Sequence, residues 1–445
     1  MDVYQEYKSK CCTADQAVQV VKDGAWVDYG MSCAYPTALD KALARRQGEL
    51  KDIKVRNAIS CHPVAVLEAD PENRTFTYNL WHCSGIDRKY LDAGRAYHEP
   101  MLFRDCGSYY RRGFAPVNVA MITVAPMDKY GNFSFGLTNG CTQEMLDAAE
   151  TIIVEVNPNM PVVFGMGSDH IHVSKVHAIV ESQEAVSLAP NREPSAIDQQ
   201  IAEKIFPYLH DGITLQLGIG GMPNALGILI AESDLKDLGM HTELMSDGYL
   251  DLYKAGKITN DKKPFQRGKG VFSICMGSKE LYEFLDCNQD ILSAPMHYVN
   301  NPETIRQLDD FISINSCIAA DLYGQVCSES AGTRQISGTG GQLDFVTGAY
   351  AADHGKAFLA MPSSRVDKKG IRHSNILPKF TAGDIITTPR TQAPYMVTEY
   401  GVANLSGLAT WQRAEALINI AHPDMREALI KAAEAQRIWR RSNKR

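Results

Sequence analysis

Three short stretches of the sequence carry residues that could form a catalytic site. Glu243 lies in a short run, residues 240–245, that is typical of the end of a buried strand. A glycine-rich turn precedes it at residues 218–221, and a second one follows at residues 338–341. Turns of this kind offer backbone N–H groups to an anion, so a carboxylate between two of them suits a nucleophile. The alternative is an ordinary surface glutamate at a strand end, and spacing alone does not exclude it.

The upstream turn, Gly218-Ile219-Gly220-Gly221, follows a predicted strand. Pro223 comes directly after the turn and is a suitable first residue of a helix. Free N–H groups and the dipole of that helix would favour binding of an anion. The turn is not the dinucleotide fingerprint GxGxxG, which requires glycine where Pro223 stands. A tight turn without a ligand is the alternative interpretation.

The downstream turn contains three glycines within four residues, Gly338, Gly340 and Gly341. Glycines at this density allow the backbone to approach a ligand closely. The polar residues Gln342 and Asp344 follow, and they alternate with large apolar residues. The apolar residues indicate that the turn packs against a core, although a flexible surface loop is the alternative.

Strands and helices alternate along the whole chain. Apolar runs that predict strands stand at residues 117–124, 151–156, 270–276 and 311–319. Helical patterns stand between them, for example at residues 141–149 and 279–285. This alternation, with nearly continuous apolar strands, predicts an α/β fold with a buried, mostly parallel sheet. A further helical region, residues 410–439, is divided at His422-Pro423.

The two halves of the sequence share a faint repeat. Asp23-Gly24 precedes a predicted strand, and Asp211-Gly212 does the same in the second half. The spacing between these two turns equals the spacing from Gly30 to Gly218, the glycines that follow the two predicted strands. A constant spacing of this kind indicates two structurally related halves.

We therefore predict two similar open α/β domains, residues 1–188 and 189–445, with the active site between them. The second domain carries Glu243. The boundary falls in the proline-containing segment 186–195, which breaks helix and strand alike.

Composition excludes several classes of protein. The chain has 445 residues, 44% of them hydrophobic and 22% charged, and its net charge is −7. This negative balance argues against general binding to nucleic acid or acidic membranes. The polar N-terminus predicts no signal peptide, and no apolar run has the length of a membrane span. The 11 cysteines include no CxxC pair, which indicates reduced thiols in a cytosol. Pairs of Cys and His at metal-ligand spacing are too few to predict a metal site.

Several long motifs in the sequence resemble the acetyl-CoA hydrolase/transferase family. They read HTELMSDG, LGIGGMPNAL, SGTGGQLDFVTGA, VTEYGVANLSGL and LINIAHPDMREAL, with VAPMDKYGNFSFG in the first half. The resemblance implies two α/β domains with the site between them and a catalytic glutamate at Glu243. It also implies that Asn300 and Gly341 stabilise the oxyanion. The CoA-binding residues that it implies are Gly218, Ile219, Gly220, Gly221, Gly338, Gly340 and Gly341.

The same resemblance implies a short-chain acyl-CoA:carboxylate CoA-transferase. WHCSGIDRK and IWRRSNK are similar to a butyryl-CoA:acetate branch of the family, and SDGYLDLYKAGKI to a 4-hydroxybutyrate branch. The implied partners are acyl-CoA and a short-chain acid such as acetate or butyrate, with coenzyme A as substrate and no permanently bound cofactor. A cytoplasmic homo-oligomer is expected, without a nucleic acid or membrane partner. The alternatives are a thioester hydrolase that uses Glu243 and a non-catalytic ligand-binding protein.

Overall fold

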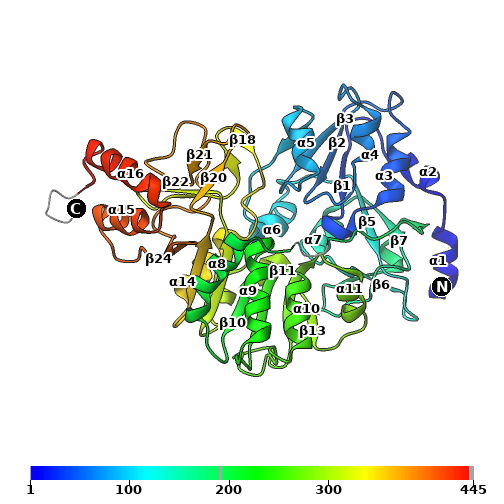
Figure 1. The fold of residues 1–445 in the computed structure, drawn as a ribbon. Coiled ribbons are helices and arrows are strands. Elements are labelled where there is room, and N and C mark those ends of the chain that lie inside the picture. Colours follow the sequence, from blue (N-terminus) through cyan, green and yellow to red (C-terminus); the bar gives the residue numbers. More distant parts are fainter. Residues whose placement is uncertain (1, 190–192, 440–445) are drawn as a thin grey trace.

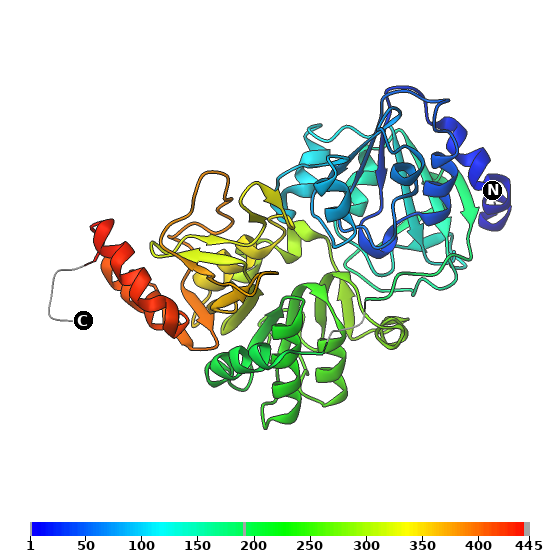
Figure 2. The ribbon, with the colours of Figure 1, turned by 45° about the horizontal axis from the view of Figure 1, so that its top comes forward.

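The computed structural model describes residues 2–189 and 193–439, and a seven-stranded parallel sheet lies in its first half (Figures 1 and 2). In sheet order its strands are β4 (Ala96–His98), β3 (Phe76–Leu80), β2 (Ile53–Asn57), β1 (Trp26–Tyr29), β5 (Val119–Val124), β7 (Thr151–Val156) and β9 (Ala178–Glu181). The central strands are almost fully buried, which explains their continuous apolar sequences.

The second half contains an eight-stranded sheet. In sheet order its strands are β13 (Ile291–Ser293), β12 (Gly270–Cys275), β11 (Gly239–Met245), β10 (Thr214–Leu217), β14 (Phe311–Ser316), β19 (Lys356–Ala360), β23 (Tyr395–Thr398) and β24 (Gly401–Asn404). All neighbours are parallel except β24, which runs antiparallel to β23 at the edge. The predicted α/β class with two similar sheets is confirmed.

Helices flank both sheets (Figure 1). Those of the first half are α1 (Val3–Lys10), α2 (Ala14–Ala17), α3 (Thr37–Ala44), α4 (Ala65–Ala69), α5 (Asp87–Asp92), the 3-10 helix η3 (Phe103–Asp105), α6 (Cys106–Arg111) and α7 (Thr142–Ala148). Those of the second half are α8 (Ala196–Ile205), α9 (Gly221–Glu232), α10 (Asp247–Lys254), α11 (Lys279–Leu285), α12 (Met296–Val299), α13 (Pro302–Ile305), α14 (Gln342–Ala351), α15 (Thr410–Asn419) and α16 (Pro423–Ala435). No helix of the described ranges is long and apolar enough to cross a membrane.

Short strands outside the two large sheets form small pairs. The pairs are β6 (Asn132–Ser134) with β8 (His170–His172), β17 (Ser330–Ala331) with β18 (Arg334–Gln335), and β20 (Ser364–Val366) with β21 (Arg372–Ser374). A three-stranded group consists of β16 (Val326–Cys327), β15 (Ala319–Asp321) and β22 (Ile376–Leu377). The single strand that we predicted for residues 311–319 is therefore wrong, because the chain leaves the large sheet after β14 and begins β15 in a different one.

The two large sheets share one strand order. Taken in sheet order, the seven strands from β4 to β9 correspond to the seven parallel strands from β13 to β23. The repeated Asp-Gly turns stand before the equivalent strands β1 and β10. Each turn makes the same backbone hydrogen bond: Gly24 N donates to Lys51 O at 3.0 Å, and Gly212 N donates to Lys236 O at 3.1 Å. The repeated spacing in the sequence therefore marks structurally equivalent elements.

The strand register gives the equivalence residue by residue. Val27 of β1 pairs with Val55 of β2, and Leu215 of β10 pairs with Met240 of β11. The spacing between Val27 and Leu215 equals the spacing between the two Asp-Gly turns. Their partners on β2 and β11, Val55 and Met240, therefore occupy corresponding places in the two sheets.

The two halves meet through a reciprocal pair of backbone contacts. Phe103 N donates to Gly340 O at 3.1 Å, and Met296 N donates to Gly140 O at 2.8 Å. Gly140 and Gly340 have nearly the same backbone φ, 53° and 55°, and each stands two residues before a helix, α7 or α14. Each half therefore inserts the same loop into the other half. The segment just before the Gly340 loop also contacts the first half, because β18 lies near α5 (Figure 1).

Two details of the sequence analysis need comment. Helix α9 begins at Gly221, so Pro223 is its third residue and not its first as we predicted. Proline is tolerated there because the first N–H groups of a helix have no partner within the helix. The expected division at residues 422–423 is confirmed, since α15 ends at Asn419 and α16 begins at Pro423. The boundary between residues 188 and 189 stays a prediction, and residues 190–192 and 440–445 lie outside the described ones.

Candidate active site

Glu243 lies near the carboxyl end of β11 and is half-buried. Its Oε2 accepts a hydrogen bond from Asn300 Nδ2 at 2.5 Å. Burial raises the pKa of Glu243 to about 7, although the Asn300 hydrogen bond acts in the opposite direction. The Glu243 carboxyl group can therefore change its protonation state near neutral pH.

Asn300 is held by its position at the end of α12. It follows the last residue of this short helix, and its side chain is fully buried. His241, two residues before the glutamate, supports the same place because its Nε2 lies 2.8 Å from Val299 O. Burial lowers the pKa of His241 to about 3, so the ring is neutral and Nε2 can donate this hydrogen bond. Strand β11 thus positions both Glu243 and, through His241, the segment that carries Asn300.

Gly341 completes the group. It is the residue before α14, and its φ of −100° is open to any residue, so space and not conformation requires glycine here. A Cβ atom at this position would overlap both Glu243 Oε2 and Asn300 Nδ2. The structure therefore brings Glu243, Asn300 and Gly341 into direct contact.

Gly338 and Gly340 of the same loop face the first half of the chain. A Cβ atom at Gly338 would lie 2.8 Å from Trp81 O, and one at Gly340 would lie 3.3 Å from the His82 ring. Gly340 also has a φ of 55°, which favours glycine. These two glycines allow the close approach of the two halves, with Gly341 left to face Glu243.

The upstream turn lies beside this group at the end of the neighbouring strand. The pairing of β10 with β11, extended by three residues beyond Leu215 and Met240, places Gly218 level with Glu243. A Cβ atom at Gly221 would overlap the Asp198 carboxylate, and Gly220 faces open space, with a φ of 117°. Gly218 N donates to Ile314 O of β14 at 2.9 Å, so this turn packs against α8 and β14.

Sequence reasoning noticed Asp344 only as a polar residue and missed its partner. Asp344 is fully buried in the first turn of α14, and its Oδ1 lies 3.1 Å from Nη1 of Arg104 in η3. Burial raises the pKa of Asp344 to about 8. The only sequence signal was a carboxylate among apolar residues, and no pattern linked it to an arginine in the other half of the chain.

A polar cluster beside Gly218 was also missed. Ser313 Oγ donates to Gln216 Oε1 at 2.7 Å, and Asn315 Nδ2 donates to the same oxygen at 2.9 Å. These side chains lie at the carboxyl ends of β10 and β14, the edge of an open α/β sheet at which ligands bind. Polar residues inside otherwise apolar strands were the available signal.

Trp81 and His82 lie on the first-half side of the downstream glycine loop, beside Gly338 and Gly340. Trp81 is buried and its Nε1 donates to Glu99 Oε2 at 2.6 Å. His82 packs on Phe103 with 5.5 Å between ring centroids, but its buried Nδ1 has no hydrogen-bond partner among the described residues. Burial lowers the pKa of His82 to about 4, so the ring is neutral. Trp81 is therefore hydrogen-bonded through its ring nitrogen, whereas one nitrogen of His82 has no partner in the described part of the chain.

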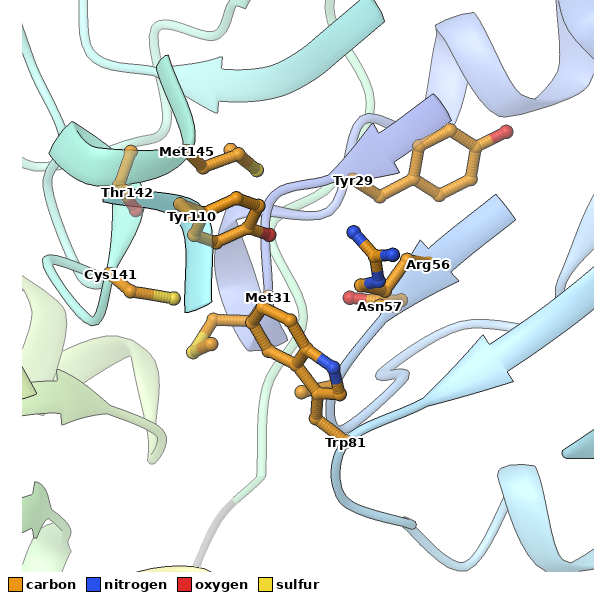
Figure 3. A pocket seen from close by; sticks show the side chains of 10 residues that line it. Tyr29, Met31, Arg56, Asn57, Trp81, Tyr110, Cys141, Thr142 and Met145 are labelled. Carbon is orange, nitrogen blue, oxygen red and sulfur yellow. The ribbon is translucent and has the colours of Figure 1, made fainter. Parts of the chain in front are cut away.

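A small pocket lies in the first half at the ends of β1 and β2 (Figure 3). Its lining residues are Tyr29, Met31, Arg56, Asn57, Ala58, Trp81, Tyr110, Cys141, Thr142 and Met145. Ala58 stands three residues after Val55 of β2, and Glu243 stands three residues after Met240 of β11, so the two residues are equivalent. Cys141 precedes α7 as Gly341 precedes α14. The pocket therefore occupies, in the first half, the place that corresponds to Glu243 and Gly341 in the second.

Among residues 2–189 and 193–439, no group of three or more His, Cys, Asp or Glu side chains could hold a metal ion. The arrangement around Glu243 consists of a carboxyl group, an amide N–H donor beside it, and a backbone loop in contact with both. These groups suit acyl transfer through negatively charged tetrahedral intermediates.

Comparison with known proteins agrees with this chemistry. Residues 1–190 match the acetyl-CoA hydrolase/transferase N-terminal domain, and residues 277–433 match the C-terminal domain of the same family. The chain is 47% identical to butyryl-CoA:acetate CoA-transferase of Anaerostipes caccae, with 100% of both chains covered. It is 39% identical to 4-hydroxybutyrate coenzyme A transferase of Clostridium kluyveri, covering 97% of this chain and 98% of that one.

Solved structures show the same fold. The crystal structure of RipA from Yersinia pestis is 34% identical, covers 98% of this chain and 100% of its own, and superimposes with a TM-score of 0.91. A 4-hydroxybutyrate CoA-transferase from Porphyromonas gingivalis is 32% identical, covers 97% and 99%, and gives a TM-score of 0.78. Because both domain models match and the relatives span nearly its whole length, the chain belongs to the acetyl-CoA hydrolase/transferase family.

Proposed function

We propose that this chain is a short-chain acyl-CoA:carboxylate CoA-transferase of the butyryl-CoA:acetate type, with Glu243 as its nucleophile. The observation that carries the proposal is the contact of Glu243 with both Asn300 and Gly341. The names of the relatives that are 47% identical support the reaction class and the acyl group.

The reaction proceeds in two half-reactions. A Glu243 carboxylate oxygen attacks the acyl-CoA carbonyl carbon, the carbon–sulfur bond breaks, and an acyl–glutamyl anhydride and CoA thiolate form. The thiolate then attacks Cδ of Glu243, the anhydride carbon–oxygen bond breaks, and a glutamyl-CoA thioester and the free acid result. An acceptor acid reverses these steps. Thioester is exchanged for thioester, so no other energy source is needed.

The neighbours of Glu243 stabilise the charge that develops in the second step. Attack on Cδ places negative charge on a Glu243 oxygen, and Asn300 Nδ2 already lies 2.5 Å from Oε2. Removing one such donor typically costs about 3 kcal/mol of transition-state stabilisation. The absence of a side chain at Gly341 lets Glu243 Oε2 and Asn300 Nδ2 take these positions.

The two glycine turns are assigned to coenzyme A in this proposal. The CoA-binding residues are Gly218, Ile219, Gly220, Gly221, Gly338, Gly340 and Gly341. Gly220 faces open space and Ile219 is 57% exposed, so this turn is accessible to a ligand at the carboxyl edge of the sheet. With the domain boundary predicted between residues 188 and 189, the proposed site lies between the domains, where water can be excluded from the anhydride. The homo-oligomeric assembly and the cytoplasmic location stay predictions.

A mass-labelling experiment tests the proposal. Incubation with butyryl-CoA alone should add the mass of CoA to a peptide containing Glu243, and borohydride should reduce this thioester and inactivate the enzyme. Kinetics with butyryl-CoA and acetate should be ping-pong. An adduct on a different carboxylate would contradict the residue assignment.

The same assay separates the alternative functions. A thioester hydrolase would release CoA without an added acid, whereas a transferase depends on the acceptor. A panel of acids that includes acetate and 4-hydroxybutyrate distinguishes the two branches of the family. A protein that binds acyl-CoA without turnover would show neither behaviour.

A further inference from the structure

Helix α12, which ends at Asn300, is held by both halves of the molecule. From its own half, the His241 ring binds the carbonyl oxygen of the last residue of the helix. On its other side, α12 packs against η3 and α6 of the first half, and Met296 N donates to Gly140 O at 2.8 Å. The position of the Asn300 amide beside Glu243 therefore depends on the first half as well as on β11.

A contact between side chains adds to this anchoring. His297 is the second residue of α12, and its Nδ1 lies 2.7 Å from Oε1 of Glu144 in α7. The Glu144 side chain is buried, and Arg111 Nη1 donates to the same oxygen at 2.8 Å. Gly107 of α6 leaves room for this carboxylate, since a Cβ atom there would lie 2.5 Å from Oε1. A carboxylate of the first half thus binds the helix that ends at Asn300.

The Glu144 carboxyl group is ionised at neutral pH. Burial alone would raise its pKa, but the hydrogen bond from His297 and the charge of Arg111 hold the pKa below the ordinary value of 4.5. An ionised acceptor makes the hydrogen bond from the histidine charge-assisted, and such bonds are stronger than those between neutral groups.

The second half makes the equivalent contact with the first. His297 and Arg104 are equivalent, because each follows the residue that donates a backbone hydrogen bond to the other half. Glu144 and Asp344 are equivalent as the third residues of α7 and α14. Arg104 Nη1 lies 3.1 Å from Asp344 Oδ1. Each half therefore holds a short helix of the other through a backbone carbonyl and a buried carboxyl group, but only α12 ends at a residue of the proposed site.

We propose that Glu144 and His297 are positioning residues for the transfer reaction. Their contact fixes α12 against the first half and thereby sets Asn300 Nδ2 beside Glu243 Oε2. The inference rests on the proposed role of Glu243 as nucleophile. Loss of the contact leaves the nucleophile and the amide in the protein but lets the helix shift, and a misplaced donor lowers the rate of the chemical step rather than the binding of substrate.

Single substitutions measure the effect on transfer from butyryl-CoA to acetate. His297→Ala should lower kcat by about ten-fold and change KM for butyryl-CoA by less than about two-fold. Glu144→Ala should lower kcat at least as much, because it removes the other partner of the same contact. The melting temperature of each variant shows whether it is folded, and His297 is suited to substitution because its side chain is 43% exposed.

A double-mutant cycle tests whether the contact acts through Asn300. In an Asn300→Ala background the amide donor is already absent, so adding His297→Ala should lower kcat by less than about two-fold. If His297 had only a general structural role, the same substitution would lower kcat by about ten-fold in both backgrounds.

The equivalent pair of the other half provides a rescue variant. Glu144→Asp combined with His297→Arg copies the pair of Asp344 and Arg104, and it should restore kcat to within about three-fold of the wild-type value. Glu144→Asp alone should stay impaired, because the shorter carboxylate is drawn away from the histidine ring.

Arg334→Ala is the matched control. Arg334 of β18 forms an ion pair with Asp92 of α5, with 2.7 Å between Nη2 and Oδ2. This pair also joins the two halves, but it does not involve α12. Its removal should therefore leave kcat unchanged.

The outcomes separate the inference from the proposed function. The inference is overturned if folded His297→Ala keeps the wild-type kcat, or if it lowers kcat equally with and without the Asn300 amide. A folded exchange variant that is no faster than Glu144→Asp alone would also contradict it. If Glu144→Ala does not fold, the cycle with His297→Ala decides. A wild-type protein that transfers no CoA and forms no adduct on Glu243 refutes the proposed function itself.

Discussion

The two halves of the molecule have the same strand order but different residues at the equivalent positions of the site. Where the second half has Glu243, the register of the first half places Ala58. Where the second half has Gly341 before α14, the first half has Cys141 before α7. The first half therefore has neither the carboxylate nor the glycine that stands beside it in the second half.

The third residue of the site differs as well. Phe103 and Met296 donate the two reciprocal hydrogen bonds between the halves, which makes them equivalent. Four residues after each stand Gly107 and Asn300. The first half thus lacks the amide donor, and a small pocket lies where the reacting groups would be (Figure 3). The fold is shared by both halves, whereas the proposed chemistry depends on three residues of only one.

The largest effect is expected when Glu243 is replaced by alanine, the residue that the first half has at the equivalent position. Glu243→Ala should reduce transfer by at least about 10^4-fold, because the attacking oxygen is lost and the nearby Asp344 carboxyl group is fully buried beside Arg104. Ala58→Gly is the matched control and should retain activity. Steady-state transfer from butyryl-CoA to acetate measures both. A folded Glu243→Ala protein with near wild-type turnover would refute the proposed mechanism.

A smaller loss is expected at the loop. Gly341→Cys copies Cys141, and its Cβ would overlap Glu243 Oε2 and Asn300 Nδ2, so the carboxylate must move. We expect a loss of about 10^2- to 10^3-fold in kcat with the melting temperature little changed. The reverse change, Cys141→Gly, should leave kcat unaffected. Normal turnover of folded Gly341→Cys would show that this loop is not part of the active site.

The third conversion removes the donor. Asn300→Gly copies Gly107 and deletes the amide that lies 2.5 Å from Glu243 Oε2. We expect about a 10^2-fold loss in kcat, which corresponds to about 3 kcal/mol. Asn300→Asp should be similarly impaired, because a carboxylate cannot donate the hydrogen bond. An Asn300→Gly variant that loses less than about three-fold would show that the backbone alone stabilises the charge.

Local sequence patterns predicted the strands, the equivalence of the two halves and the position of Glu243. Apolar runs predicted the strands, and the repeated Asp-Gly spacing predicted that β1 and β10 are equivalent. Glu243 was selected because glycine-rich turns flank it in sequence, and one of them, at Gly341, is in contact with it. These features depend on short segments whose geometry is set by a few residues.

The sequence did not predict what depends on how the two halves are docked. Arg104 and Asp344 are far apart in the chain, and neither strand periodicity nor turn chemistry relates them. Asn300 was assigned to the site only through the family resemblance, because the run Asn300-Asn301-Pro302 by itself indicates a turn. The turn at Gly218 is bound to β14 through Ile314 O, a contact between distant segments that the local sequence does not encode.

The smallest expected effect concerns stability and its pH dependence. The pKa of Glu243 is raised to about 7, above the ordinary value of 4.5, so the folded state binds this proton more tightly than the unfolded state. Below about pH 4.5 Glu243 is protonated in both states and costs nothing. As the pH rises to about 7 the unfolded state ionises first, so the folded protein loses stability, and above this range the loss is constant.

Glu243→Gln cannot ionise and should escape this loss. We expect it to match the wild-type melting temperature near pH 4.5 and to exceed it by about 2 °C at pH 8, which corresponds to about 1–3 kcal/mol. Glu203→Gln, at an exposed position of α8, is the control and should show no such pH-dependent difference. A constant difference between wild type and Glu243→Gln at all pH values would contradict the raised pKa. Ala58, the equivalent residue of the first half, has no ionisable group. The loss of stability at high pH is therefore expected only from Glu243, in the second half.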